Sequence, residues 1–161
     1  MSEEAQTPDA EQGISKFYYT VGNHHILLED GIKTEIIEKQ NTFPIPHTPS
    51  WCYGMISLRG KLIPVASLHK ILGSAEASRS KWLLVIEMAP YPQIAIRIDS
   101  LPAQQFIDVE SQEALKHSEL PHWFDKSLLV EEKTFYSVNH AKLFEQLIQQ
   151  NEVSRTDLQE A

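Results

Sequence analysis

Residues 54–73 read GMISLRGKLIPVASLHKILG, and this stretch sets the local fold. Trp51–Leu58 and Leu62–Leu68 are apolar, strand-like runs on either side of Gly60-Lys61, which predicts two β-strands joined by a turn. His69–Gly73 then has the length of a short helical turn, and it ends at a glycine, the residue that most readily adopts a left-handed conformation. We therefore expect a hairpin followed directly by a helical turn.

The segments before this hairpin alternate strand-like runs with turn residues. Phe17–Val21 is aromatic and β-branched, Gly22-Asn23 is a hairpin turn signal, and His25–Leu28 is the expected return strand. Gly31–Glu38 fits a helix by the spacing of its isoleucines and a strand by its β-branched content, so both assignments stay open. Pro44–Pro49 contains three prolines and predicts an extended loop.

The segments after the hairpin continue the β pattern and end in a helix. Strands are expected at Trp82–Met88, Gln93–Ile98, Leu128–Val130 and Thr134–Val138. Asn139 is a candidate N-cap for a last helix, whose apolar stripe consists of Leu143, Phe144, Leu147 and Ile148. Ser111–His122 has too little periodicity to assign. Short strands separated by turns predict a mainly β sandwich or barrel rather than a helical or βαβ fold.

Composition limits the class of protein. The chain has 161 residues, 42% of them hydrophobic, which is enough for one domain or for two small subdomains with a shared core. No apolar run approaches the roughly 18 residues of a membrane span, and the acidic start MSEEAQTPDAEQ is unlike a secretory signal, so we expect a cytoplasmic protein. Of the formal charge of −8, residues 1–12 carry −4 and residues 151–161 carry −2. The rest has no strongly basic surface, which argues against nucleic-acid binding.

Residues suited to catalysis form no recognisable site. Cys52 is the only cysteine, which excludes an internal disulfide and a thiolate zinc site, and we interpret it as a small buried hydrophobe. The seven histidines have no HxH or HxxxH spacing and are interpreted as solvated or capping residues. Ser57 lacks a GxSxG elbow and is expected on a strand with no exposed hydroxyl, and the glycines form no phosphate-binding loop. We therefore expect no enzyme activity, no metal and no cofactor.

Arg59 is the unusual residue of the hairpin, because it stands alone among apolar strand residues with Gly54 and Gly60 on its two sides. A guanidinium cannot be buried without partners. Its head either reaches solvent, a nearby carboxylate or a carbonyl, or is held at the strand end as a fork of donors for a binding partner. The residues alone leave both interpretations open.

The same stretch resembles the signature of the CheW-like family, in which a glycine, an apolar strand, an Asn-Leu-Arg-Gly corner, an Ile/Val-Pro-Val strand and an Asp-Leu pair precede a short helix. FYYTVGNHHILL is similar to the family's opening hairpin, PIPHTPSW to its proline loop, and FYSVNHAKLF to its closing strand and helix. TEI at 34–36 and IRIDSL at 96–101 also have counterparts, so the resemblance covers about residues 16–148. It implies two intertwined, five-stranded, SH3-like β-barrels over residues 15–150 with a C-terminal helix. We expect the acidic tails, 1–14 and 151–161, to be disordered.

The resemblance also implies a function. Such proteins are non-catalytic adaptors that join the cytoplasmic tip of a methyl-accepting chemoreceptor to the regulatory domain of a CheA-type histidine kinase, without a cofactor or direct insertion into the membrane. They act in the cytoplasm at membrane-associated receptor arrays. By resemblance, Glu35, Gly54, Arg59 and Gly60 occupy positions used for receptor or kinase contact and for shaping the groove between the barrels.

Three departures from the family pattern bear on the partner. Ser57 replaces the Asn of the corner, Ser67 replaces the Asp of the Asp-Leu pair, and Lys33 replaces an apolar residue of the receptor groove. We therefore add Ser57 and Lys33 to the candidate partner-binding residues. The changes suggest a specialised paralogue, serving a pilus-type (twitching motility) array. The alternatives are a stand-alone docking module that has lost kinase coupling, and a small β-barrel enzyme, which would require a pocket with convergent polar groups.

Overall fold

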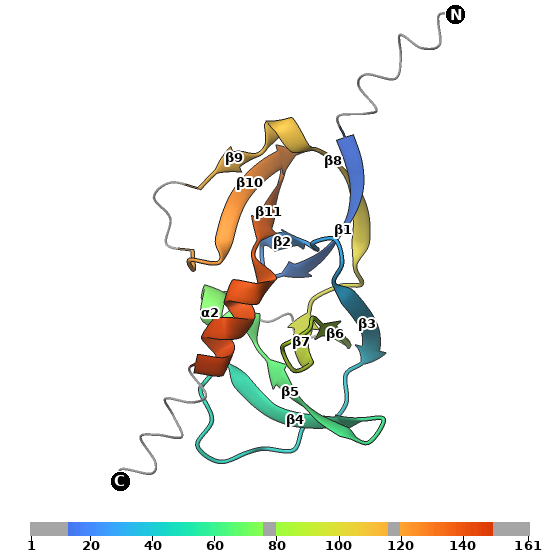
Figure 1. The fold of residues 1–161 in the computed structure, drawn as a ribbon, viewed down its shortest axis with the longest axis vertical. Helices are drawn as coiled ribbons and strands as arrows, with labels where there is room; N and C mark the ends of the chain where they lie inside the picture. Colours follow the sequence, from blue (N-terminus) through green and yellow to red (C-terminus); the bar gives the residue numbers. More distant parts are fainter. Residues whose placement is uncertain (1–12, 76–79, 116–119, 150–161) are drawn as a thin grey trace, which may run out of the picture.

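The structure is a computed structural model, which describes residues 13–75, 80–115 and 120–149. Two β-sheets, a short helix and a C-terminal helix make up these ranges (Figure 1). The mainly β architecture expected from the sequence is confirmed. The predicted disorder of the tails concerns residues that lie almost entirely outside the described ranges.

The first sheet has six strands in the order β8-β1-β2-β11-β10-β9. They are β1 (Gly13–Val21), β2 (His24–Leu27), β8 (Ala103–Asp108), β9 (Glu113–Ala114), β10 (Phe124–Val130) and β11 (Lys133–Val138). The two edge strands, β8 and β9, are consecutive in the chain and are separated only by the 3-10 helix η2 (Val109–Ser111) and Gln112. One kinked segment therefore pairs with β1 at one edge and with β10 at the other, which curls the sheet into a barrel. Counted as one broken strand, β8 and β9 complete the expected five.

The second sheet has five strands in the order β3-β6-β7-β5-β4. They are β3 (Lys33–Glu38), β4 (Cys52–Leu58), β5 (Lys61–Ala66), β6 (Trp82–Glu87) and β7 (Ile94–Ile98). The chain that leaves β3 returns at Phe43, which forms a β-bridge with Met55 at the free edge of β4, with N···O distances of 2.7 and 2.9 Å. A kinked segment thus closes this barrel as well.

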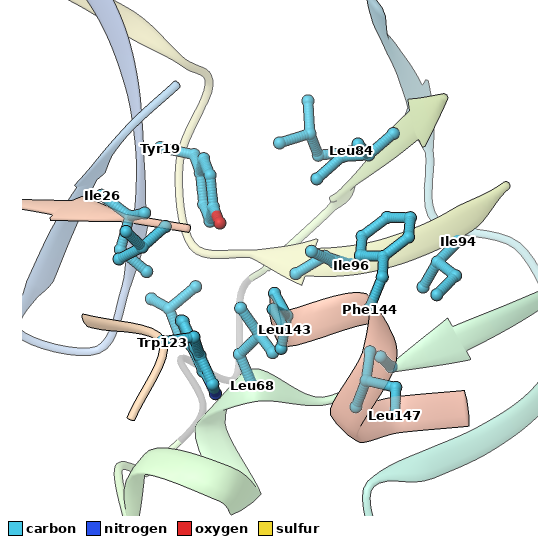
Figure 2. Close-up of a cluster of buried hydrophobic side chains, with 14 of the residues drawn as sticks. Tyr19, Ile26, Leu68, Leu84, Ile94, Ile96, Trp123, Leu143, Phe144 and Leu147 are labelled. Atoms are coloured by element: carbon cyan, nitrogen blue, oxygen red, sulfur yellow. The ribbon is translucent and has the colours of Figure 1, made fainter. Parts of the chain in front are cut away.

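The barrels are intertwined, because residues 33–98 form the whole second sheet and are inserted between β2 and β8 of the first. The largest buried cluster draws side chains from both sheets and from the C-terminal helix (Figure 2). Tyr19 and Ile26 come from the first sheet, and Leu84 and Ile96 from the second. Smaller clusters fill each barrel separately. The shared core makes the two barrels one packing unit.

Both helices are capped, and two of the caps, Gly73 and Asn139, are those that the sequence predicts. In α2 (Leu68–Leu72), the Ser67 hydroxyl accepts a hydrogen bond from the Lys70 amide, and Gly73 ends the helix with a φ of 69°. The C-terminal helix covers residues 140–149 of the described chain, and Asn139 Oδ1 accepts the Lys142 amide at 3.0 Å. Its predicted apolar stripe is buried, apart from a half-buried residue at position 148: Leu143, Phe144 and Leu147 lie in the shared core.

Several boundaries differ from the sequence expectations. The ambiguous segment 31–38 contains a strand, because β6 pairs with all six residues of β3. Strand β1 begins at Gly13, two residues inside the expected N-terminal tail, because β8 supplies Asp108 as its partner. Strands β8 and β9 were not assigned, and β10 begins four residues earlier than expected, at Phe124. Only Ile107 of β8 is buried, so β8 lacks the apolar alternation by which strands are recognised.

Candidate partner-binding site

The turn between β4 and β5 consists of Arg59 and Gly60, one residue earlier than expected, and Leu58 pairs with Lys61 across it. Both turn residues have positive φ, 50° for Arg59 and 81° for Gly60. Two-residue hairpins favour this conformation because its twist matches that of the strands. Gly60 is at the position where such a turn most needs glycine, and a Cβ there would meet nothing within 4 Å. Arg59 is therefore a turn residue at the tip of the hairpin.

The Arg59 guanidinium binds the Glu35 carboxylate through two hydrogen bonds. Nη1 donates to Oε2 at 2.9 Å, and Nη2 donates to Oε1 at 2.6 Å. The side chains remain 63% and 41% exposed. The hydrogen bond from Arg59 lowers the pKa of Glu35, and the same contact raises the pKa of Arg59. Of the two interpretations of Arg59, the pairing with a nearby carboxylate is the one observed, and the outer side of its head still faces solvent.

This ion pair joins the two edges of the second barrel. Glu35 lies on β3, which is one edge strand of the second sheet. Arg59 lies at the tip of the β4-β5 hairpin, and β4 is the other edge strand. The Phe43-Met55 bridge closes the barrel along β4. Glu35 and Arg59 thus brace the closed barrel and present one planar pair of opposite charges to solvent.

Gly54 has a structural role in this closure. It is buried, its φ is 124°, and a Cβ at this position would lie 2.5 Å from the Phe43 carbonyl oxygen. Only glycine allows the returning chain to approach β4 this closely. Because Gly54 is buried, it can affect a partner only through the shape of the barrel.

Lys33 and Ser57 are both exposed on edge strands of the second sheet, Lys33 on β3 and Ser57 on β4. Lys33 precedes Glu35 by two residues on β3, hence on the same face, and pairs in register with Glu87. Ser57 faces outward on β4, opposite Leu62. The expectation that its hydroxyl is not exposed is wrong, because strand alternation turns Ile56 into the barrel and Ser57 out of it. All six candidate residues thus belong to the second barrel, and the structure brings Glu35 and Arg59 into direct contact.

An apolar surface beside this tip was missed from the sequence. Leu62 is 65% exposed and Phe43 is 56% exposed. A groove of about 540 Å³ runs from Lys61 and Leu62 past Pro64 to Tyr91 and Pro92. The alternation of β5 contained the signal, since Ile63 and Val65 point into the barrel and their neighbours must point out.

Ser67 lies away from this surface. It is fully buried, and its hydroxyl caps α2 and accepts a hydrogen bond from Tyr53 Oη at 3.1 Å. The replacement of the family's Asp by Ser67 therefore keeps an N-capping residue and changes no exposed group. Cys52, expected to be buried, is half-buried and packs against the shared core.

Two histidines are buried, contrary to the expectation that all are solvated or capping. His69 Nε2 lies 2.9 Å from Asp99 Oδ1, and Asp99 Oδ2 accepts the Gly22 amide at 2.6 Å, which links α2 to the first hairpin. His140 contacts Tyr19 Oη at 2.9 Å and Glu29 Oε1 at 2.8 Å. Both contacts use carboxylates distant in sequence, which makes burial of the rings tolerable. These polar links connect the two barrels and the C-terminal helix.

The described ranges contain no group of three or more His, Cys, Asp or Glu side chains arranged to hold a metal ion. Within the same ranges, no helix has the length and apolar character needed to cross a membrane.

Comparisons with known proteins bear on the family and the fold. The family model for the CheW-like domain matches residues 21–147. A chemotaxis protein CheW from Thermotoga maritima is 41% identical over 51 residues, which are 31% of this chain and 34% of that protein. The match therefore spans about a third of the relative. The crystal structure of the scaffolding protein CheW from Thermoanaerobacter tengcongensis has a TM-score of 0.66 at 21% identity, covering 78% of this chain and 88% of that one.

The solved structure supports the fold of two SH3-like barrels, and the family model covers most of the chain, including the Gly54–Gly60 segment. This chain belongs to the CheW-like domain family.

Proposed function

We propose that this chain is a non-catalytic chemosensory adaptor that joins the cytoplasmic tip of a methyl-accepting chemoreceptor to the regulatory domain of a CheA-type histidine kinase. It acts in the cytoplasm at membrane-associated receptor arrays. Membership of the CheW-like family supports this role, as does the scaffolding function named for the protein from Thermoanaerobacter tengcongensis.

The Glu35-Arg59 pair is the observation that carries the proposal. A bidentate pair fixes both side chains in one plane, and Arg59 keeps further N–H groups facing solvent for a partner's carboxylate or carbonyl. The apolar groove beside it offers the buried contact that a polar anchor alone cannot supply. Each interface is of modest area, and avidity among many copies in an array strengthens the assembly.

Lys33 and Ser57 favour a changed partner. Both are departures from the family pattern, and both are exposed, Lys33 two residues before Glu35 and Ser57 two residues before Arg59. We propose a pilus-type array that controls twitching motility. Deletion of the gene should impair twitching and leave flagellar swimming unchanged, and the opposite result would reject the pilus assignment.

Pull-down of the host's chemoreceptors and CheA-type kinases tests the adaptor function. The native chain should capture at least one protein of each kind, and Arg59→Ala should lose that capture while its unfolding free energy changes by less than about 1 kcal/mol. Lys126→Ala, which removes an exposed cation from the first barrel, is the matched control and should bind normally. If the native chain captures neither class of protein, the adaptor function is wrong.

Exchanging the charges of Glu35 and Arg59 distinguishes two roles of the ion pair, which are direct contact with a partner and stabilisation of the closed barrel. The double variant Glu35→Arg, Arg59→Glu rebuilds an ion pair between β3 and the hairpin with reversed polarity. If the native side chains contact a partner, the double variant should still fail to bind it, although the ion pair that stabilises the closed barrel is restored. Recovery of binding would show that only the closed barrel matters.

A stand-alone docking module is the second candidate, because the exposed Lys33 and Ser57 change the surface while the buried Ser67 does not. It predicts that Arg59→Ala leaves kinase-dependent signalling unchanged. Loss of array assembly in that variant would exclude it.

A further inference from the structure

Strand β8 is a sheet edge without protection. It pairs with β1 over six residues, and no second strand covers its other side in the described chain. Residues 103–107 read AQQFI, with no charge, proline or glycine, and the pairing has no bulge. By contrast, the edge strand β3 carries Lys33, Glu35 and Glu38, the kind of charged edge that prevents strand pairing, and the edge strand β9 is only two residues long. Residues 103–107 of β8 lack these devices, and the only charged residue of β8 is Asp108, at its C-terminal end.

The register shows which groups face outward from β8. Leu28 donates to the Phe17 carbonyl at 2.9 Å, so Phe17 is bonded toward β2, and its neighbours along β1 are bonded toward β8. Lys16 is opposite Gln105, so Gln105 points its backbone groups at β1. By alternation, the amides and carbonyls of Gln104, Phe106 and Asp108 lie on the free edge.

The side chains of the same three residues share one exposed face. Phe106 is 55% exposed and lies opposite Ser15, and Phe17, opposite Gln104, is 53% exposed. The two phenylalanines are diagonal neighbours on the outside of the first barrel. The Phe106 ring lies over Gly13 rather than over Phe17, since a Cβ at Gly13 would overlap it. Exposed aromatic side chains beside an open edge are an arrangement that another strand could cover.

We propose that β8 pairs antiparallel with β8 of a second copy of this chain, about a two-fold axis at Phe106. This register places Phe106 opposite its symmetry mate and Gln104 opposite Asp108 of the other copy. It pairs the outward backbone groups of both strands, although the Phe106 carbonyl also accepts the Gln105 side-chain amide at 3.2 Å. The Gln104 amide can donate to the Asp108 carboxylate, which within its own chain accepts the Glu110 amide at 3.2 Å and the Ser111 hydroxyl at 3.0 Å and keeps further lone pairs. The two Asp108 side chains are separated by about four residues of strand, whereas a parallel pairing would bring them together. This complementarity of β8 with itself selects a second copy as the occupant.

The contact is small. One pair of strands, with two phenylalanines from each copy, buries less accessible surface than the roughly 800 Å² per partner that is typical of a stable interface. The dimer is therefore weak and forms at high local concentration, as in an array of many copies. It is independent of the Glu35-Arg59 surface, which belongs to the second barrel.

Sedimentation equilibrium of the full chain, at concentrations up to about 1 mM, tests the pairing. The native chain should dimerise reversibly. Gln104→Lys, which places a cation opposite Asp108 at two symmetric positions, should lower the dissociation constant by about threefold to tenfold, and Gln104→Glu should raise it by a similar factor. Gln104 is exposed, so neither change disturbs the fold. Leu129→Ala, which removes a 69% exposed apolar side chain on β10, is the control and should leave the dissociation constant unchanged.

Hydrogen exchange of backbone amides tests whether the free edge of β8 is the contact surface of the dimer. Protection of the Gln104, Phe106 and Asp108 amides should rise with protein concentration. A chain that is monomeric throughout, or a dimer indifferent to the charge at position 104, overturns the proposal. So does protection of these amides that is independent of concentration, because it would assign the edge to a segment of the same chain.

Discussion

Gly54 and Gly60 show that two glycines of one signature can be required for different reasons. Gly54 has a φ of 124° and lies against the Phe43 carbonyl, whereas Gly60 needs only a positive φ in an open turn. The first glycine makes barrel closure possible, and the second one serves the hairpin. Neither role involves a partner directly.

Gly54→Ala should therefore destabilise the protein far more than Gly60→Ala. The first change combines a forbidden φ with a clash against backbone and should cost more than about 3 kcal/mol, while the second should cost about 1–2 kcal/mol. Urea denaturation of both variants measures the difference. Equal losses would mean that the chain at Phe43 moves away from β4 at little cost.

Helix α2 begins where the chain leaves β5, and its N-cap lies in a buried position. Ser67 satisfies the Lys70 amide and also receives the Tyr53 hydroxyl, so one side chain serves the helix and its contact with β4. At the level of elements, the family's Asp and this chain's Ser67 are alternative caps.

Ser67→Asp should leave the unfolding free energy within about 1 kcal/mol of the native value, whereas Ser67→Ala should cost about 1–2 kcal/mol through the lost cap and the orphaned Tyr53 hydroxyl. Thermal and urea unfolding of the two variants give the comparison. A more stable Ala variant would show that the cap contributes nothing here.

The start of the C-terminal helix depends on Glu29. Its carboxylate accepts the His140 backbone amide at 2.7 Å and contacts His140 Nδ1, and the side-chain hydrogen bond with His140 holds the pKa of Glu29 below its ordinary value of 4.5. Because the folded pKa is depressed, this group stabilises the fold above pH 4.5, and that stabilisation is lost as the pH falls through the folded pKa.

Glu29→Gln should lower stability at neutral pH and flatten the decline of stability below about pH 4.5. Thermal unfolding between about pH 3 and pH 7 measures this in both proteins. Glu110→Gln, an exposed carboxylate in η2 on the first barrel, is the control and should retain the native decline. Parallel curves for Glu29→Gln and the native chain would contradict the assigned role of Glu29.

The whole molecule is held together by the core between the barrels. Tyr19 and Ile26 meet Leu84 and Ile96 there, and the C-terminal helix inserts Leu143 among them (Figure 2). The first barrel contains both the first strand, β1, and the last strand, β11, of the described chain, so neither barrel can unfold without exposing the shared core.

Leu143→Ala should cost about 2–5 kcal/mol and still give one cooperative transition, with tryptophan fluorescence and far-ultraviolet circular dichroism coincident. Leu129→Ala, at a 69% exposed position, should change stability little. Two separated transitions in the native chain would contradict the view of the barrels as a single unit.

Alternation and turn chemistry determined much of the fold from sequence alone. The β4-β5 hairpin, α2 with its glycine, β6, β7, β11 and the Asn139 cap each depend on residues a few positions apart, and the structure has all of them. The same local pattern carried the resemblance to the CheW-like family. It located the segment that contains the candidate site, although not the roles of its residues.

Only the tertiary structure decided the rest, because the partners are distant in the chain. Strand β3 is a strand because β6 pairs with it, and β8 because β1 does. Arg59 pairs with a carboxylate 24 residues away, and His140 is buried beside one 111 residues away. Local sequence states which groups need a partner, while the packing of distant segments determines which group meets that need.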